Sequence, residues 1–476
     1  MSLLRSSAFR YIFIRYVTYI IQFLNSILIA RLLGSYQYGI YSFILLYLQY
    51  YSYTNLGLNS SFNIIGASFK KDVSYFHVIW SNAFLVNLIL CIIFSIISLF
   101  FCIYPFEYLI KYDYQEYALL LAMVAPVINL NNLFVTLYKL HAKLDKVNLY
   151  QLLPNLLILV VCIIDFNLSI KTIMYCFFIA NFISLCVFFY LPPQKVSLKF
   201  DYKIIKDLIS RGISLLLYNL SSTFLKSAVL TVISFYFSVT TMGIYSFANV
   251  VSNAVVMLGG AVMFIFYPKI LSKYVSANKE QASELSKNID NTYIIAINII
   301  CFTSLLAYSL LTFFIYEFLE SMQIYKVLLL SQIFMNSSTS SSIFLISQKK
   351  EFYLVYIGCL SIVISIIVSV LLCYIDVDIE IISLTILFSS LIYSSLILIL
   401  EKKLCKDDIN LKLLYHSVFK GTAVPALLIL LSICIEENVI LIFLALMLYV
   451  YTCKSKLRFL VKTSLNIFSN NNMLKF

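Results

Sequence analysis

Residues 9–30 read FRYIFIRYVTYIIQFLNSILIA. This apolar run is long enough to cross the roughly 30 Å hydrocarbon core of a bilayer as one helix, and similar runs recur along the chain. Hydrophobic residues make up 62% of the 476 residues, charged residues make up 12%, and the mean hydropathy is +0.94. A soluble domain carries about 25% charged residues, so most of this chain is expected to lie in lipid.

The apolar runs predict an all-α polytopic membrane protein with about fourteen transmembrane helices. A transmembrane β-barrel would instead show alternating segments of about ten residues. The predicted spans are 9–30, 39–62, 78–103, 117–138, 149–165, 171–191, 212–236, 243–266, 291–316, 324–346, 353–374, 381–400, 414–434 and 438–453.

The distribution of positive charge tests this division. With the N-terminus in the cytosol, 27 of the 34 Lys and Arg residues fall in cytosolic connections, four fall on the outer side and three lie within spans. Positive residues concentrate in cytosolic loops, and one missed span would invert every later connection. We therefore expect an even number of spans with both termini in the cytosol. The net charge of +12 comes mainly from these connections, so we attribute it to membrane topology and expect no nucleic acid as a partner.

The sequence carries no pattern of an enzyme or of a metal centre. Its eleven Cys are scattered, without a CxxC pair or a Cys/His cluster at zinc spacing. It shows no nucleophile constellation, and the connections are too short for a soluble catalytic domain. We predict a non-enzymatic protein that uses no metal or cofactor. Because the first apolar run is long and lacks a convincing cleavage site, we interpret it as a retained helix, not a signal peptide.

A short motif divides the chain into two halves. Residues 39–43 read GIYSF, and residues 243–247 repeat this motif at an offset of 204 residues. The offset covers six predicted spans, an even number, so the two halves have the same orientation in the membrane. Transporters of several families are built from such repeats, with the substrate site at the repeat interface. We predict six-helix bundles over 1–200 and 201–404, and two extra helices with a basic tail over 405–476.

The first span of each half carries a polar stripe. Span one has six polar residues at helical spacing, namely Arg15, Thr18, Tyr19, Gln22, Asn25 and Ser26. The same offset relates the first four to Asn219, Ser222, Thr223 and Lys226 in span seven. Polar groups facing lipid are costly, so two matched stripes with a cation each favour a central cavity. Contact between neighbouring helices is the alternative for the uncharged residues.

The charges inside the spans favour an anionic substrate. Lys226 lies about fourteen residues into its span, or about 21 Å. Arg15 lies closer to the cytosolic end and could reach that surface. Arg31 marks the outer end of span one, where an interfacial anchor is the alternative. No Asp or Glu lies squarely inside a predicted span, so these cations have no matching acids.

The segments Ala30-Arg31-Leu32-Leu33-Gly34, Tyr38–Ser42 and Asn55-Leu56-Gly57-Leu58 carry a family resemblance. The chain resembles the Wzx-type flippases of polysaccharide biosynthesis, in the superfamily of MATE drug exporters and lipid II flippases. The likeness covers residues 8–66 and is weaker around Gly243. It implies two six-helix halves around a central cavity, alternating access, often ion-coupled, and a place in the bacterial inner membrane.

The resemblance also implies a substrate and partners. The substrate would be an O-antigen or capsule repeat unit on undecaprenyl pyrophosphate, moved from the cytosolic to the periplasmic leaflet. A polysaccharide polymerase and a chain-length regulator are candidate partners, besides the membrane lipids. Arg15 and Lys226 would bind the pyrophosphate. The sugar hydroxyls would meet four amide side chains from both halves: Gln22, Asn25, Asn219 and Asn253. Arg31 is a further candidate for substrate binding.

Two other functions stay open at the level of sequence. A MATE-type drug exporter would favour acidic residues in its cavity for cationic drugs, whereas these spans offer cations. A membrane glycan polymerase or ligase would have a large outer loop with catalytic Arg or His. Here the outer connections are short, and His77, His141 and His416 all fall on the predicted cytosolic side.

Overall fold

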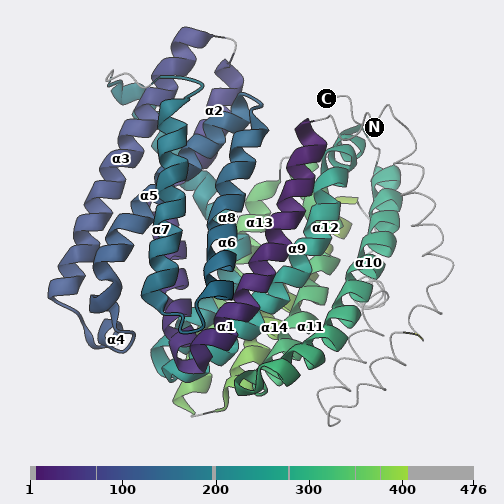
Figure 1. Cartoon of the computed structure of the whole chain (residues 1–476). Helices are drawn as coiled ribbons and strands as arrows, with labels where there is room; N and C mark the ends of the chain where they lie inside the picture. Colours follow the sequence, from purple (N-terminus) through teal and green to yellow (C-terminus); the bar gives the residue numbers. More distant parts are fainter. Residues whose placement is uncertain are drawn as a thin grey trace. The chain divides into compact units, whose positions relative to one another are not determined.

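The computed structural model describes residues 7–405, except 71, 196–199, 277–278, 349 and 376, together with Met447. Within this part the regular elements are helices (Figure 1). They are α1 (Ser7–Tyr53), α2 (Leu58–Phe69), α3 (Val73–Ile103), α4 (Glu107–Ile110), α5 (Tyr114–Leu140), α6 (Leu144–Ile164), α7 (Ile170–Tyr190), α8 (Tyr202–Tyr236), α9 (Val239–Ser276), α10 (Lys279–Phe314), the 3₁₀ turn η2 (Tyr316–Phe318), α11 (Ser321–Ser337), α12 (Thr339–Ser347), α13 (Glu351–Tyr374) and α14 (Ile379–Cys405). The predicted all-helical fold is confirmed.

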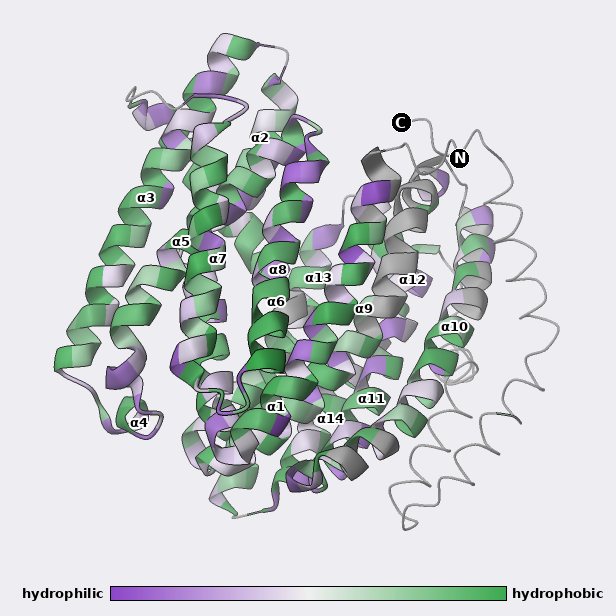
Figure 2. Ribbon diagram, in the orientation of Figure 1, coloured by the Kyte–Doolittle hydropathy of each residue, from purple (hydrophilic) through white to green (hydrophobic). Residues whose placement is uncertain are grey.

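Seven of the described helices are long and apolar enough to cross a membrane. They match the predicted spans closely, and the stretches 227–236 and 293–309 are shorter apolar helices. Figure 2 shows hydrophobic residues along most of α3. The side chains of Ile89, Ile92, Ile96 and Phe100 on this helix are each about half exposed or more, which suits contact with lipid. The predicted spans 414–434 and 438–453 lie outside the described residues, so the count of fourteen stays a prediction.

Helix α1 combines the first two predicted spans. Its 47 residues would extend about 70 Å if straight, more than twice the hydrocarbon thickness. The backbone breaks at Gly34, which has φ 70° and ψ 171°. This residue lies in the predicted connection between residues 30 and 39, so α1 consists of two membrane helices joined at a glycine.

The second predicted span does not run unbroken to residue 62. Helix α1 ends at Tyr53, and α2 begins at Leu58 after a turn in which Leu56 and Gly57 have φ 51° and 72°. A side chain at Gly57 would bring its Cβ to 2.1 Å from the carbonyl oxygen of Gly212. The prediction missed this break because the apolar pattern continues through it, while the turn depends on a tertiary contact.

The chain divides into two compact units. Unit 1 comprises Met1–Leu220 and Phe237–Gly243, and unit 2 comprises Ser221–Tyr236 and Ile244–Phe476. Two of the boundaries fall inside α8 and α9, and the third lies at the C-terminal end of α8. The predicted boundaries at residues 200 and 404 stay predictions.

Unit 1 is held together by aromatic packing and by asparagines that bind neighbouring backbones. In Figure 1, α5 lies beside both α3 and α7. Trp80, Phe134 and Phe188 form its core and are at most 1% exposed. Asn131 Nδ2 donates a hydrogen bond of 2.8 Å to the carbonyl of Asn181, which joins α5 to α7. Polar contacts of this kind are a common means of joining helices in membranes.

The two copies of the GIYSF motif contribute to one close contact within unit 1. A Cβ built on Gly39 would lie 2.0 Å from the carbonyl oxygen of Val239. A Cβ built on Gly243 would lie 2.1 Å from the carbonyl oxygen of Ser35. These pairs are reciprocal, because the offset of 204 residues converts Ser35 into Val239 and Gly39 into Gly243. Glycine is required at both positions since the backbones of α1 and α9 touch there.

In unit 2, α14 packs along α11 and α13, and α10 packs on α11. The rings of Tyr308 and Tyr325 stack with their centroids 3.8 Å apart. The predicted span 324–346 is divided at Ser338 into α11 and α12. The serines of this segment donate hydrogen bonds to carbonyls of the preceding turn, for example Ser337 to Phe334 and Ser338 to Met335.

Candidate functional site

The polar face of α1 divides into two lines along the helix. Tyr11, Thr18 and Asn25 follow one another at intervals of seven residues and are 6%, 5% and 4% exposed. Asn25 Nδ2 donates a hydrogen bond of 2.8 Å to the carbonyl of Asn155 in α6. This first line therefore faces the interior of unit 1 and contributes to helix packing.

The second line consists of Arg15 and Gln22, again seven residues apart. Arg15 is partly buried and Gln22 is exposed, and both belong to the candidate membrane span of α1. An exposed amide and a cation are unfavourable against lipid. This second line is therefore the part of α1 best suited to face water or a polar substrate.

Two tyrosines fix the position of the Arg15 guanidinium. Nε donates a hydrogen bond of 2.6 Å to Oη of Tyr19, and Nη1 donates one of 3.2 Å to Oη of Tyr11. The guanidinium carbon lies 5.5 Å from the ring centroid of Tyr19 and 5.9 Å from that of Tyr11, within the range of cation–π attraction. The tyrosines stand one helical turn before and after Arg15. Both are neutral, so they hold the cation in place without cancelling its charge.

Lys139 is a second cation near Arg15, and the sequence did not single it out. It was assigned to the connection after the predicted span 117–138, whereas α5 continues to Leu140 and carries Lys139 in its last turn. Helix α5 packs against α1, and the positive charge of Arg15 acts on the exposed Lys139. Two neighbouring cations form a better site for a multiply charged anion than one. Only the packing of α5 on α1 reveals this pair.

Two other predicted site residues of unit 1 are Arg31 and Asn219. Arg31 is exposed near the C-terminal end of the first part of α1. Asn219 in α8 donates a hydrogen bond of 3.4 Å to Oγ of Ser60 in α2. The structure therefore places Arg15, Gln22, Asn25 and Arg31 on α1, and Asn219 on α8, where it contacts α2.

Two predicted site residues belong to unit 2. Asn253 in α9 is partly buried and donates a hydrogen bond of 3.1 Å to Oδ1 of Asn249, one turn earlier. Lys226 lies on α8, and its side chain is outside the described part of the structure. The pairing of Lys226 with Arg15 across a central cavity stays a prediction.

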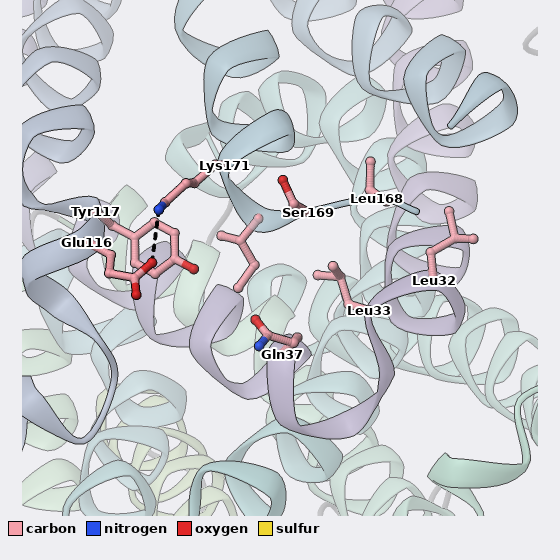
Figure 3. A pocket seen from close by; sticks show the side chains of 9 residues that line it. Leu32, Leu33, Gln37, Glu116, Tyr117, Leu168, Ser169 and Lys171 are labelled. Atoms are coloured by element: carbon pink, nitrogen blue, oxygen red, sulfur yellow. Dashed lines mark ion pairs between the residues drawn. The ribbon is translucent and has the colours of Figure 1, made fainter. Parts of the chain in front are cut away.

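A separate pocket of about 340 Å³ lies beside the break in α1. Leu32, Leu33 and Gln37 line it from α1, and the other lining residues come from α5, α7 and the connection before α7 (Figure 3). Lys171 Nζ and Glu116 Oε2 form an ion pair of 3.0 Å at its edge. Because this pair is neutral as a whole, the pocket suits an anion less well than the Arg15 line does.

Comparison with known proteins decides the family. The sequence matches the family described as "Polysaccharide biosynthesis protein" over residues 27–323, well over half of the chain. The protein belongs to this family. No curated protein sequence matches the chain.

This polysaccharide biosynthesis protein shares its fold with solved transporters. A structure of the lipid II flippase MurJ in an inward closed conformation has a TM-score of 0.71 at 13% identity, covering 94% of this chain and 99% of that one. An inward-facing multidrug resistance MATE transporter of the MOP superfamily has a TM-score of 0.64 at 13% identity, covering 82% and 94%. An outward-facing multidrug resistance MATE transporter of the MOP superfamily has a TM-score of 0.56, also at 13% identity, covering 85% and 97%. At these identities the likeness establishes the fold.

Two buried charges of this polysaccharide biosynthesis protein were not identified as site residues from the sequence. Lys326 was counted among the outer-side charges, and its side chain in α11 is completely buried. Glu401, which directly follows the predicted span 381–400, lies in α14 and is 2% exposed. The predicted span ended at residue 400 because Lys402 and Lys403 follow. The burial of Glu401 depends on neighbouring helices and leaves no mark in the local sequence.

Proposed function

We propose that this protein is a flippase for a lipid-linked oligosaccharide. It moves an O-antigen or capsule repeat unit on undecaprenyl pyrophosphate from the cytosolic to the periplasmic leaflet of a bacterial inner membrane, by alternating access. Its termini lie in the cytosol. Membership of the polysaccharide biosynthesis family and the fold shared with a lipid II flippase support this proposal.

The observation that carries the proposal is the Arg15 line in unit 1. A pyrophosphate entering the membrane needs cations, and the Arg15 guanidinium is held by two neutral tyrosines with Lys139 close by. A planar guanidinium suits phosphate oxygens, since it can donate parallel hydrogen bonds. Gln22 on the same line would meet a sugar hydroxyl. Lys226 would supply a further positive charge from α8.

A MATE-type drug exporter is the second candidate, because two of the similar structures are multidrug transporters. A cationic drug needs acidic groups at its site, whereas Arg15 on α1 and Lys139 at the end of α5 are positive. The described part of the structure gives no specific observation that favours a glycan polymerase or ligase. A polysaccharide polymerase and a chain-length regulator would act on the flipped product and are proposed as partners.

Deletion and complementation in the native host test the proposal. Cells without the protein should accumulate lipid-linked repeat units on the cytosolic face of the inner membrane and lose surface glycan. Normal surface glycan in a deletion strain that has no second flippase would refute the function.

Point variants in the same assay test the site. Arg15→Ala and Lys226→Ala should abolish complementation, while Arg15→Lys and Lys226→Arg should retain part of it because the charge remains. Arg10→Ala is the matched control on α1, since Arg10 forms only an exposed ion pair of 3.3 Å with Asp145. Exposed pairs contribute at most about 1 kcal/mol, so this control should complement normally. Full activity of both alanine variants would remove these residues from the site.

A further inference from the structure

The pocket beside the break in α1 has a polar edge and an apolar wall. The ion pair of 3.0 Å between Lys171 Nζ and Glu116 Oε2 forms the polar edge, and Leu32, Leu33 and Leu168 lie across the pocket from it (Figure 3). The volume of about 340 Å³ is within the range of pockets that bind small ligands. A pocket divided in this way suits an amphiphile, which has one polar and one apolar part.

The ion pair lies where two membrane helices begin. Glu116 is in the first turn of α5, and Lys171 is the second residue of α7. Both helices are candidate membrane spans, and they pack against each other. The side chains of the pair are about half exposed, 50% for Lys171 and 56% for Glu116. The two charges are therefore at the level of the headgroup region that borders the hydrocarbon core.

An exposed apolar face continues from the ion pair along both helices. On α5, Leu119 and Met123 lie one and two turns after Glu116 and are 60% and 47% exposed. On α7, Tyr175 and Ile179 lie one and two turns after the lysine and are 52% and 50% exposed. Because the two charged side chains meet, these apolar rows lie side by side. A lipid whose headgroup is at the ion pair would have its acyl chains along this face.

The two charges define the headgroup that fits. The pair is neutral as a whole, so a headgroup with one net charge is attracted by one side chain and repelled by the other. A zwitterionic headgroup can instead pair its phosphate with Lys171 and its cation with Glu116. Opening the existing pair costs little, since exposed ion pairs contribute little to stability. A primary ammonium suits Glu116 better than a quaternary one, because it can donate charge-assisted hydrogen bonds to the carboxylate.

Helix α1 lines the pocket on both sides of its break. Leu32 and Leu33 precede Gly34, and Gln37 follows it. The Gln37 amide can donate a hydrogen bond to a phosphate or ester oxygen, while the two leucines can contact the glycerol backbone and the first methylenes. A ligand shifts a conformational equilibrium by its differential affinity for the two states. A lipid that contacts both parts of α1 therefore favours the angle between them at which both contacts form.

We propose that this pocket, with the adjoining faces of α5 and α7, binds a zwitterionic phospholipid with a primary ammonium, as in phosphatidylethanolamine, and that the bound lipid stabilises the bend of α1. The phosphate pairs with Lys171, the ammonium pairs with Glu116, and an acyl chain follows the exposed apolar face. The inference goes beyond the proposed function, and the binding can be measured without transport.

Native mass spectrometry of the full chain tests the headgroup. The protein in detergent is given equal amounts of phosphatidylethanolamine, phosphatidylglycerol and phosphatidylcholine with identical acyl chains. The wild type should bind the first about tenfold more tightly than the other two, which corresponds to about 1.4 kcal/mol. Glu116→Gln should lose this preference, and Lys171→Gln should bind all three lipids more weakly.

The matched control is Asp207→Asn, because it removes a similarly exposed ion pair of 3.1 Å with Arg211 on α8. This variant should keep the preference of the wild type. Equal binding of the three lipids by the wild type, or an unchanged preference in Glu116→Gln, would overturn the proposal.

Quenching of a tryptophan by brominated lipid tests the position. The chain has one tryptophan, Trp80, so Trp80→Phe combined with Leu119→Trp places a single reporter beside the pocket. In phosphatidylglycerol vesicles with a small share of brominated phosphatidylethanolamine, this reporter should be quenched more strongly than one at Ile96→Trp, a position that is 61% exposed on α3. Equal quenching at the two positions would refute the site. Undecaprenyl phosphate that reverses the quenching at a lower mole fraction than unlabelled phosphatidylethanolamine would assign the pocket to the transported lipid and also overturn the proposal.

Discussion

Replacing Gly39 by alanine should weaken the contact between α1 and the start of α9 in unit 1. The added Cβ would lie 2.0 Å from the carbonyl oxygen of Val239, whereas ordinary contacts begin at 3.4 Å. The two backbones must therefore separate by about 1.4 Å, the difference between these distances. Overpacking costs about 1–3 kcal/mol, and the upper value applies because the opposing atom belongs to a backbone and cannot rotate away.

The net effect includes the better helix propensity of alanine. Alanine is favoured over glycine by about 1 kcal/mol within a helix, which leaves a loss of about 2 kcal/mol. For a unit of roughly 200 residues this corresponds to a fall in the melting temperature of about 4–8 °C. This shift can be measured by heating the purified protein in detergent and using size-exclusion chromatography to determine the fraction that stays folded at each temperature.

Gly66→Ala is the matched control. Its Cβ would lie 3.0 Å from Cδ1 of Leu140, the end of a flexible side chain that can move. Its melting temperature should stay close to that of the wild type. The double variant with Gly39→Ala and Gly243→Ala should lose less stability than the sum of the single losses, because backbones separated by the first alanine already admit the second. Equal melting temperatures for Gly39→Ala and Gly66→Ala, or strict additivity of the pair, would refute this reasoning.

Two further predictions concern local contacts in unit 1. Asn131→Leu removes the buried hydrogen bond of 2.8 Å to the carbonyl of Asn181, so stability should fall by about 0.6–2 kcal/mol, measured in the same melting assay; no loss would show that this contact does not hold α5 to α7. Asp72 caps α3 outside the membrane span, and the backbone N–H of Tyr75, with a further hydrogen bond from Ser74, lowers the pKa of its carboxyl. A carboxyl with a lowered pKa stabilises the fold above its ordinary pKa of about 3.9, and this stabilisation disappears as the pH falls through the lowered pKa. Asp72→Ala should therefore melt slightly below the wild type at pH 7 and together with it in strong acid, and a difference that persists in acid would contradict the capping role.

The sequence by itself determined the helical class, the membrane setting and most helix positions. These properties follow from apolar composition and run length, which act locally: α3, α5, α7 and α13 begin and end within a few residues of the predicted spans. The repeat was also visible, because both copies of GIYSF need glycine where helices touch. The family resemblance around Ala30–Leu58 agreed with the family that the whole sequence matches.

Tertiary structure decided which polar groups are buried and what they contact. The stripe on α1 looked uniform in sequence, yet packing on α6 buries Thr18 and Asn25 and leaves Gln22 exposed. Lys139 is recognised as a neighbour of Arg15 only because α5 packs on α1. The sequence places Glu401 beside a basic cytosolic connection, whereas in the structure it lies in α14 and is buried against α12. Burial and charge pairing depend on residues far apart in the chain, whereas hydropathy is a property of neighbours in sequence, and this is why the helices were predictable and the surroundings of their charges were not.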